Sequence, residues 1–246
     1  MSTFVLVHGA YHGAWCWEKV IPYLVQHGHC VKAVDLPGHG EDQTPIAQIT
    51  LQSYVNTTIA AIEAAAEPVI LVGHSAGGIV ISQVAELCPE KVESLVYLTA
   101  LVPQSGQSIF SAAMADSASE VPATLVLNEA EGWAFSKDEF IGPVYYTDCS
   151  EQDIAAAKAR LRVEPLGAAM EPVSITPERF GQVTKYYIEC LGDHAISPGY
   201  QKQMYTLTPV KEVFSLETSH SPFLSAPKDL AKILRHVAKI GEKSHT

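Results

Sequence analysis

The strongest constraint in the sequence is a serine that separates an apolar run from a helical run. Residues Val69–His74 (VILVGH) are the most apolar short run in the chain, as expected of a strand buried on both faces of a parallel sheet. Residues Gly77–Leu87 continue in a helical pattern, and only Ser75 and Ala76 lie between the two runs. Glycines on both sides fit a turn where side chains would meet the neighbouring strand and helix. The segment predicts a strand–turn–helix unit of an α/β fold.

Other short apolar runs predict the rest of a sheet. The expected strands are Thr3–His8, Val31–Asp35, Val69–His74, Ser94–Ala100, Thr184–Cys190 and Val210–Leu216. Helical patterns lie between them, at Trp15–His27, Leu51–Ala66, Gly77–Leu87, Glu151–Val163, Gly199–Thr206 and from about Pro227 onward. Strands that alternate with helices favour a doubly wound, mostly parallel sheet of six strands with right-handed crossovers.

The alternation stops between residues 103 and 182. This stretch is rich in Ala, Ser, Glu and Pro and contains no strong parallel-strand run, although Ala123–Leu127 fits a short extended piece. Linkers, repeats and low-complexity tracts are absent from the sequence. We interpret residues 103–182 as a cap inserted over the sheet, within a single domain that spans residues 1–246.

Composition narrows the possible functions. Hydrophobic residues make up 47% of the chain and charged residues 17%, which favours a large core over disorder. The formal net charge of −11 disfavours binding to nucleic acid or to anionic membranes. The N-terminus has no basic targeting pattern, and no apolar run is long enough to span a bilayer. The five cysteines are scattered and predict reduced thiols, so we expect a cytoplasmic protein.

The placement of Ser75 also points to chemistry. A serine at the sharp turn of a G-x-S-x-G motif holds its hydroxyl above the carboxyl edge of the sheet. Such a hydroxyl becomes a good nucleophile when an imidazole removes its proton. His220 lies in the loop between the last expected strand and the C-terminal helix, where a base is required, whereas His236 lies within that helix. Ser75 is therefore the candidate nucleophile and His220 the candidate general base.

A carboxylate is needed to orient the histidine. The loop after the Ser94–Ala100 strand contains none. The loop after Thr184–Cys190 contains one, Asp193, and Glu189 is the alternative but lies within the strand. Asp193 is the candidate acid.

Acyl transfer also needs backbone N–H groups that face the developing oxyanion. We expect one from Ala76, which follows the nucleophile, and one from Ala10, in the loop after the first strand. Gly9 in the same loop lets substrate approach the backbone closely. His8 and His12 are interpreted as braces of this loop. The histidines show no paired spacing typical of a metal site, so neither metal nor cofactor is expected.

Apolar residues in and near the expected cap suggest a substrate pocket. Gly9, Leu101, Leu125 and Trp133 are the candidate substrate-binding residues, and Phe110, Phe135 and Met170 are further apolar candidates. Each of these cap residues fits a cap core equally well.

With these residues identified, the chain resembles the α/β-hydrolase superfamily, in the branch of plant hydroxynitrile lyases, plant methyl esterases and their bacterial esterase relatives. The matching segments are FVLVHGAYHGAWCW (Phe4–Trp17), DLPGHG (Asp35–Gly40), GHSAGG (Gly73–Gly78), DHAISPGYQ (Asp193–Gln201) and HSPF (His220–Phe223). In the family the acid lies five residues before a proline and eight before a glutamine, which fits Asp193. Lyases of this branch have a threonine in place of Gly9 and a lysine in place of Ser221.

These observations lead to three functional hypotheses. The first is a serine-dependent carboxylic-ester hydrolase that forms an acyl-enzyme on a small, partly apolar ester. The second is a hydroxynitrile lyase, which the absence of the lysine weakens, because departing cyanide then has no cationic stabiliser. The third is a ligand-binding receptor that retains the fold. Small-molecule esters are the expected partners, and the resemblance implies a possible homodimer.

Overall fold

Six parallel strands form the central sheet of the computed structural model, which describes residues 1–244 and the side chains of residues 1–241. The strands are β1 (Thr3–Val7), β2 (Cys30–Val34), β3 (Val69–His74), β4 (Val92–Leu98), β8 (Thr184–Cys190) and β9 (Glu212–Leu216). They lie in the order β2-β1-β3-β4-β8-β9, and every neighbouring pair is parallel. This confirms the predicted doubly wound sheet. Residues 245 and 246 of the predicted domain lie outside the described residues.

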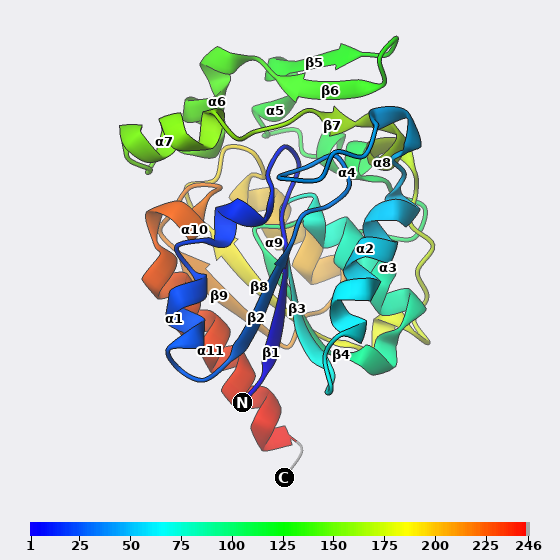
Figure 1. Cartoon of the computed structure of the whole chain (residues 1–246), viewed down its shortest axis with the longest axis vertical. Helices are drawn as coiled ribbons and strands as arrows, with labels where there is room; N and C mark the ends of the chain where they lie inside the picture. The colour runs from blue at the N-terminus through cyan, green and yellow to red at the C-terminus, as the bar shows by residue number, and fades with distance from the viewer. Residues whose placement is uncertain (245–246) are drawn as a thin grey trace.

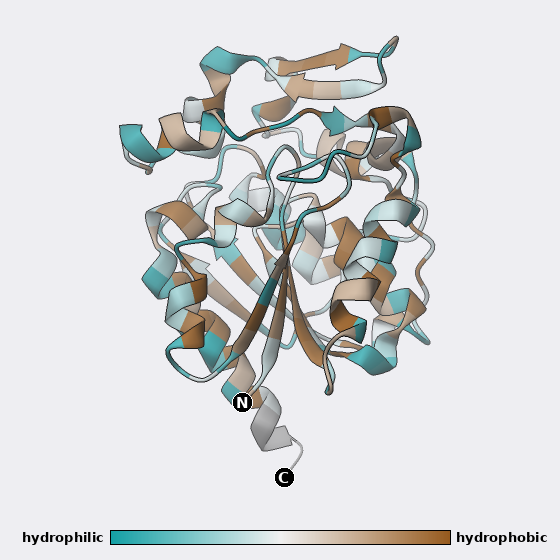
Figure 2. Ribbon diagram, viewed as in Figure 1, coloured by the Kyte–Doolittle hydropathy of each residue, from teal (hydrophilic) through white to brown (hydrophobic). Residues whose placement is uncertain are grey.

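Helices cover both faces of this sheet (Figure 1). The helices are α1 (Ile21–Val25), α2 (Leu51–Glu63), α3 (Gly77–Leu87), α9 (Pro198–Leu207), α10 (Pro222–Ser225) and α11 (Pro227–Ser244). Apolar side chains of α2, α3 and α9 pack in one core cluster, whereas those of α10 and α11 pack in the other. Figure 2 shows hydrophobic residues running along the central strands between these layers.

Strand β3 lies at the centre of both core clusters. All six of its residues are buried. Val69 and Leu71 belong to one cluster, and Ile70 and Val72 belong to the other. Successive side chains of a strand point to opposite faces, so a strand between two helical layers must be apolar at every position.

One predicted helix is wrong. Trp15–His27 is divided into a 3₁₀ turn at Ala14–Trp17 and the short helix α1. Pro22 lies in the first turn of α1, where its missing N–H costs nothing, so the proline starts a new helix instead of continuing one. The predicted helices at Leu51–Ala66 and Glu151–Val163 are present but end earlier, at Glu63 and Lys158.

The segment between β4 and β8 carries the elements that lie above the carboxyl ends of the strands, at the top of Figure 1. They are α4 (Ile109–Met114), α5 (Val121–Thr124), β5 (Leu125–Asn128), β6 (Trp133–Ser136), α6 (Asp138–Tyr145), α7 (Glu151–Lys158), β7 (Glu164–Pro165) and α8 (Leu166–Met170). Strands β5, β6 and β7 form a small antiparallel sheet, and β5 overlaps the expected extended piece. We call residues 103–170 the cap.

Residues 171–182, at the end of the predicted cap range, contact helix α3. The chain after residue 170 packs along α3, where the Glu86 carboxylate accepts hydrogen bonds from the backbone N–H groups of Thr176 (2.8 Å) and Phe180 (3.1 Å). Gln83 of α3 accepts a further bond from the N–H of Ser174 at 2.8 Å. The segment also bonds to the start of the cap, where the Gly106 N–H donates to Val173 O at 2.8 Å, and it connects the cap to β8. Among residues 1–244, no helix is both long and apolar enough to cross a membrane.

Candidate active site

Ser75 lies in the turn between β3 and α3 with a φ of 51°. This left-handed conformation is uncommon for a residue with a side chain. Two hydrogen bonds hold it: the Ser75 N–H donates to Leu98 O (3.3 Å), and the Leu101 N–H donates to Ser75 O (3.0 Å). The flanking glycines are required, because a Cβ at Gly73 would lie 2.8 Å from Gly77 O, and one at Gly77 would lie 2.6 Å from His8 O. The turn therefore fixes the backbone of Ser75.

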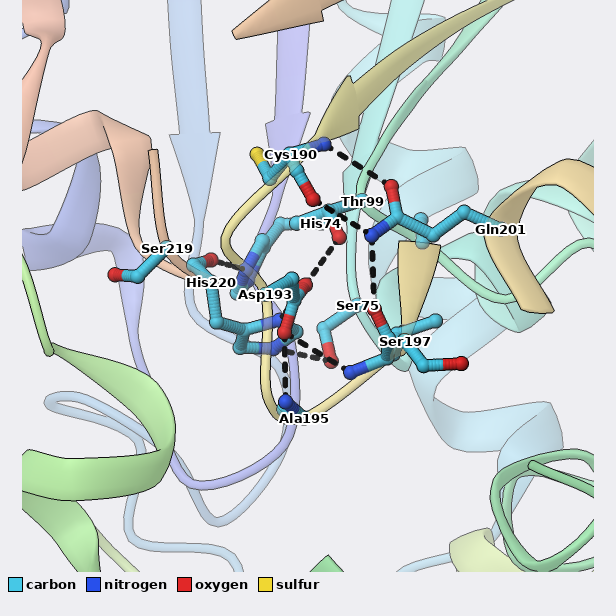
Figure 3. A network of polar contacts seen from close by, with 12 residues as sticks. His74, Ser75, Thr99, Cys190, Asp193, Ala195, Ser197, Gln201, Ser219 and His220 are labelled. Atoms are coloured by element: carbon cyan, nitrogen blue, oxygen red, sulfur yellow. Dashed lines mark hydrogen bonds and ion pairs between the residues drawn. The ribbon is translucent and has the colours of Figure 1, made fainter. Parts of the chain in front are cut away.

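The structure brings Ser75, His220 and Asp193 into one line of contacts (Figure 3). The distance from Ser75 Oγ to His220 Nε2 is 3.0 Å, and the distance from His220 Nδ1 to Asp193 Oδ2 is 2.7 Å. The side chains of His220 and Asp193 are 2% and 0% exposed. In this arrangement Nδ1–H donates to the carboxylate, and Nε2 is free to accept the serine proton.

The Asp193 carboxylate is held on its other sides by the protein. Oδ1 accepts hydrogen bonds from the N–H groups of Ala195 (2.7 Å) and Ile196 (3.0 Å), and Oδ2 also accepts from the Thr99 hydroxyl. The alternative acid, Glu189, instead accepts from the hydroxyls of Tyr205 and Ser215 and does not contact His220. Geometry therefore favours Asp193 over Glu189 as the partner of the histidine.

Two buried histidines orient the predicted oxyanion loop. His8 Nδ1 donates to Gly9 O at 2.8 Å, and His12 Nδ1 donates to Ala10 O at 2.8 Å. In a trans peptide the carbonyl and the next N–H point in opposite directions. Holding the Gly9 carbonyl on one side therefore directs the Ala10 N–H to the other. Among the hydrogen bonds of residues 1–244, none has the N–H of Ala10 or Ala76 as its donor.

These histidines are neutral. Burial lowers the pKa of His12 to about 3, and burial also lowers the pKa values of His8 and His74 well below their ordinary range. The acceptor nitrogens of His8 and His12 are occupied: the Leu36 N–H donates to His8 Nε2 (3.1 Å), and the Tyr146 hydroxyl donates to His12 Nε2 (2.6 Å). His8 and His12 thus act as braces, as the sequence indicated.

The cap contacts the loop that carries His220. Asp148, which follows α6, accepts a hydrogen bond from the Ser219 N–H at 3.0 Å and another from the Ser219 hydroxyl. From below, His74 Nε2 donates to the carbonyl of His220 at 2.9 Å. The backbone on both sides of the candidate base is therefore fixed, once by the cap and once by the sheet.

A cavity of about 90 Å³ lies between Ser75 and the cap. Its lining is mostly apolar with few polar groups, which suits a small, partly apolar ligand. Leu101 and Leu125 line it together with Ala10, Ala76 and Phe110. The remaining lining residues are Tyr11, Ile109, Ala113, Met114, Val121, Ala134, Tyr145, Glu164, Ala169, Ala195 and Ile196.

Four predicted pocket residues do not line the cavity: Gly9, Trp133, Phe135 and Met170. Trp133 does not line the cavity; its neighbour Ala134 does, because successive residues of β6 face opposite sides. The indole N–H of Trp133 instead donates to the exposed Glu131 at 2.7 Å. Gly9 lies directly behind the serine, since a Cβ at Gly9 would be 2.7 Å from Ser75 Cβ.

Three residues of the site were missed from the sequence: Tyr145, Glu164 and Asp148. Tyr145 and Glu164 line the cavity from the cap, and Asp148 holds the His220 loop. No motif marks any of them, because their positions depend on how the cap sits on the sheet. Among residues 1–241, whose side chains the structure describes, no group of three or more His, Cys, Asp or Glu side chains is arranged to hold a metal ion.

Known proteins resemble this chain over almost its full length. Residues 4–233 match the alpha/beta hydrolase family. The chain is 35% identical to methylesterase 7 of Arabidopsis thaliana over 96% of each protein, and 35% identical to putative methylesterase 12, chloroplastic, of the same plant, over 98% of this chain and 72% of that protein. The crystal structure of polyneuridine aldehyde esterase superposes with a TM-score of 0.88 at 26% identity, covering 97% of this chain and 99% of that one.

Proposed function

Because the chain belongs to the alpha/beta hydrolase family, we propose that it is a serine-dependent carboxylic-ester hydrolase that acts through an acyl-enzyme. Its similarity to plant methylesterases supports an esterase-type hydrolase. The observation that carries the finer proposal is the contact line from Ser75 Oγ through His220 to Asp193 at the foot of the cavity. The substrate class is a small, partly apolar ester, because the cavity is small and most of its lining is apolar.

In the first half of the reaction, Ser75 Oγ attacks the carbonyl carbon while His220 Nε2 takes the hydroxyl proton. The negative charge that develops on the carbonyl oxygen is stabilised by the N–H groups of Ala10 and Ala76. Asp193 keeps Nδ1 protonated and stabilises the imidazolium. When the tetrahedral intermediate collapses, the C–O bond to the alcohol breaks, and His220 gives its proton to the leaving oxygen.

In the second half, water attacks the acyl carbon and transfers a proton to His220. The bond from the acyl carbon to Ser75 breaks, the serine oxygen recovers the proton, and the carboxylic acid leaves. Each step needs only groups that the chain supplies, together with water.

The lyase hypothesis has less support. Ser221, which stands where the related lyases have lysine, is fully buried and does not line the cavity. A threonine at position 9 would collide with Ser75 unless the first loop moved. The receptor hypothesis, the homodimer and the cytoplasmic location stay predictions.

A substrate panel tests the proposal. Purified protein is assayed with nitrophenyl and methyl esters of short acids, and with mandelonitrile in parallel. We expect ready ester hydrolysis, with acyl-serine trapped at Ser75 on rapid quenching, and little mandelonitrile cleavage. Fast mandelonitrile cleavage with negligible ester hydrolysis would reject the esterase in favour of the lyase, and binding without turnover would favour the receptor.

A further inference from the structure

A carboxylate lies in the wall of an otherwise apolar cavity. Glu164, in β7 of the cap, lines the cavity and is 5% exposed. Its neighbour across the small sheet is Ala134, which lines the same cavity. Ser75 and Ala76 form part of the opposite wall, so Glu164 faces the space that a bound ester would fill from the cap side.

Protein groups hold this carboxylate from behind. The Tyr54 hydroxyl, from α2, donates to Oε1 at 3.1 Å. His39 Nε2 lies 3.2 Å from Oε2. Tyr54 and His39 are buried and neither lines the cavity, so the hydrogen bond from Tyr54 fixes the carboxylate without covering its inner side.

A carboxylate offers about four acceptor positions on its two oxygens. Tyr54 and His39 occupy at most two of them. A buried carboxylate with unused acceptors is costly, because it has lost water without gaining a replacement. A purely apolar substrate would leave that cost in place, whereas a donor on the substrate would remove it.

Other hydroxyl groups of the cap are hydrogen-bonded to one another. The Tyr145 hydroxyl lies 2.6 Å from Ser136 Oγ, which lies 3.1 Å from Thr124 Oγ1. Glu164 is therefore the carboxyl acceptor that the cap presents to the cavity.

We propose that Glu164 is a specificity-determining residue that accepts a hydrogen bond from a hydroxyl or ammonium group of the substrate, at a point away from the scissile carbonyl. This inference rests on the proposed esterase function and names its substrate class: small esters with one hydrogen-bond donor. A site built to bind such a donor discriminates strongly against the analogue that lacks it, because its polar groups are then left unpaired.

Matched ester pairs test the inference. Butyl acetate is compared with ω-hydroxypropyl acetate, which carries the donor on the alcohol part of the ester. Methyl heptanoate is compared with the methyl esters of ω-hydroxy- and ω-aminohexanoic acid, which carry the donor on the acyl part. In the wild type we expect kcat/KM to favour a donor-bearing ester over its methyl-terminated partner by about 10-fold or more, the value of one hydrogen bond to a charged group.

Two substitutions separate specificity from structure. Glu164→Leu is expected to abolish the preference, and Glu164→Gln to reduce it most for the ammonium ester. The control is Glu171→Gln, because Glu171 also ties this region to α2, accepting from the Leu51 N–H at 2.8 Å, but does not line the cavity. It is expected to leave the preference unchanged.

The outcomes are distinct. A wild type that hydrolyses every pair without preference overturns the inference while the esterase stands. Glu164 variants that slow both members of each pair equally also overturn it and leave Glu164 as a cap anchor. A wild type that hydrolyses none of these esters, nor those of the substrate panel, overturns the proposed function itself.

Discussion

The two walls of the cavity are built by different means. On the sheet side, Ser75, Asp193 and His220 lie in loops after β3, β8 and β9. Backbone groups bond to Ser75 and Asp193, and the buried His74 side chain donates to the carbonyl of His220. On the cap side, the lining side chains are held by other side chains, such as the chain of hydroxyls from Thr124 to Tyr145. Backbone bonds survive most substitutions nearby, whereas side-chain bonds do not. The chemistry should therefore be robust to sequence change, and the substrate range should not.

Removal of the candidate nucleophile is expected to have the largest effect. Ser75→Ala should lower kcat by on the order of 10⁶ without unfolding the protein. The matched change on the cap side is Ser136→Ala, which removes a buried hydroxyl of the same size and should cost far less. Steady-state kinetics and thermal denaturation of both variants check this. Comparable losses of kcat in the two variants would contradict the proposed difference between the sheet side and the cap side.

Loss of the Asp193 carboxylate should have the second-largest effect on kcat. Asp193→Asn is expected to lower kcat about 10⁴-fold, because the amide favours the wrong tautomer of His220. Glu189→Gln, in the same strand–loop region but bonded to Tyr205 and Ser215, is the control and should stay near wild type. The reverse result would show that the acid has been assigned incorrectly.

A single methyl group behind the serine should have an intermediate effect. Gly9→Ala places a carbon 2.7 Å from Ser75 Cβ, so the loop or the serine must shift. Displacements of about 1 Å cost on the order of 10²-fold in rate. Gly199→Ala is the control, since its Cβ would meet nothing within 4 Å. If both variants kept full kcat, the sheet side would be more tolerant than we argue.

The smallest expected effect concerns stability on acidification. The folded-state pKa of His12, about 3, is below its ordinary value of 6.5 because the ring is buried. The unfolded chain therefore binds the proton first, and stability present above pH 6.5 is lost as pH falls toward 3. The loss is about 1.4 kcal/mol per pH unit for one histidine.

Thermal and urea unfolding between pH 7.5 and pH 4.5 measure this slope. His12→Gln should give a shallower slope from a lower starting stability, and the exposed His236→Gln should reproduce the wild-type slope. An unchanged slope in His12→Gln would mean that the acid sensitivity arises elsewhere.

The sheet and the three candidate catalytic residues could be predicted because their signals are local. Buried parallel strands must be apolar at every position, and Ser75 lies in a turn that demands small neighbours. The cap could not be predicted in the same way. Its strands β5 and β6 have four residues each, and the sequence of so short a strand does not indicate which face lines the cavity. The sequence predicts Trp133 as an apolar pocket residue, but Ala134 lines the cavity, because successive residues of a strand face opposite sides.

Polar residues of the cap were missed for a different reason. Glu164 and Asp148 resemble surface carboxylates in the sequence, and their partners, Tyr54 and Ser219, lie 110 and 71 residues away. Pairings at such separations follow from the folded arrangement and leave no local pattern.

The contact between Asp148 and Ser219 limits how freely this architecture can be re-engineered. Exchange of caps between related enzymes is an obvious route to new substrates, since the sheet keeps the reacting groups. Here, however, a transplanted cap without a carboxylate at position 148 would remove both acceptors of the Ser219 N–H and hydroxyl, one residue before the base. The graft boundary would therefore have to include both partners, so that cap and base loop are inherited as one unit.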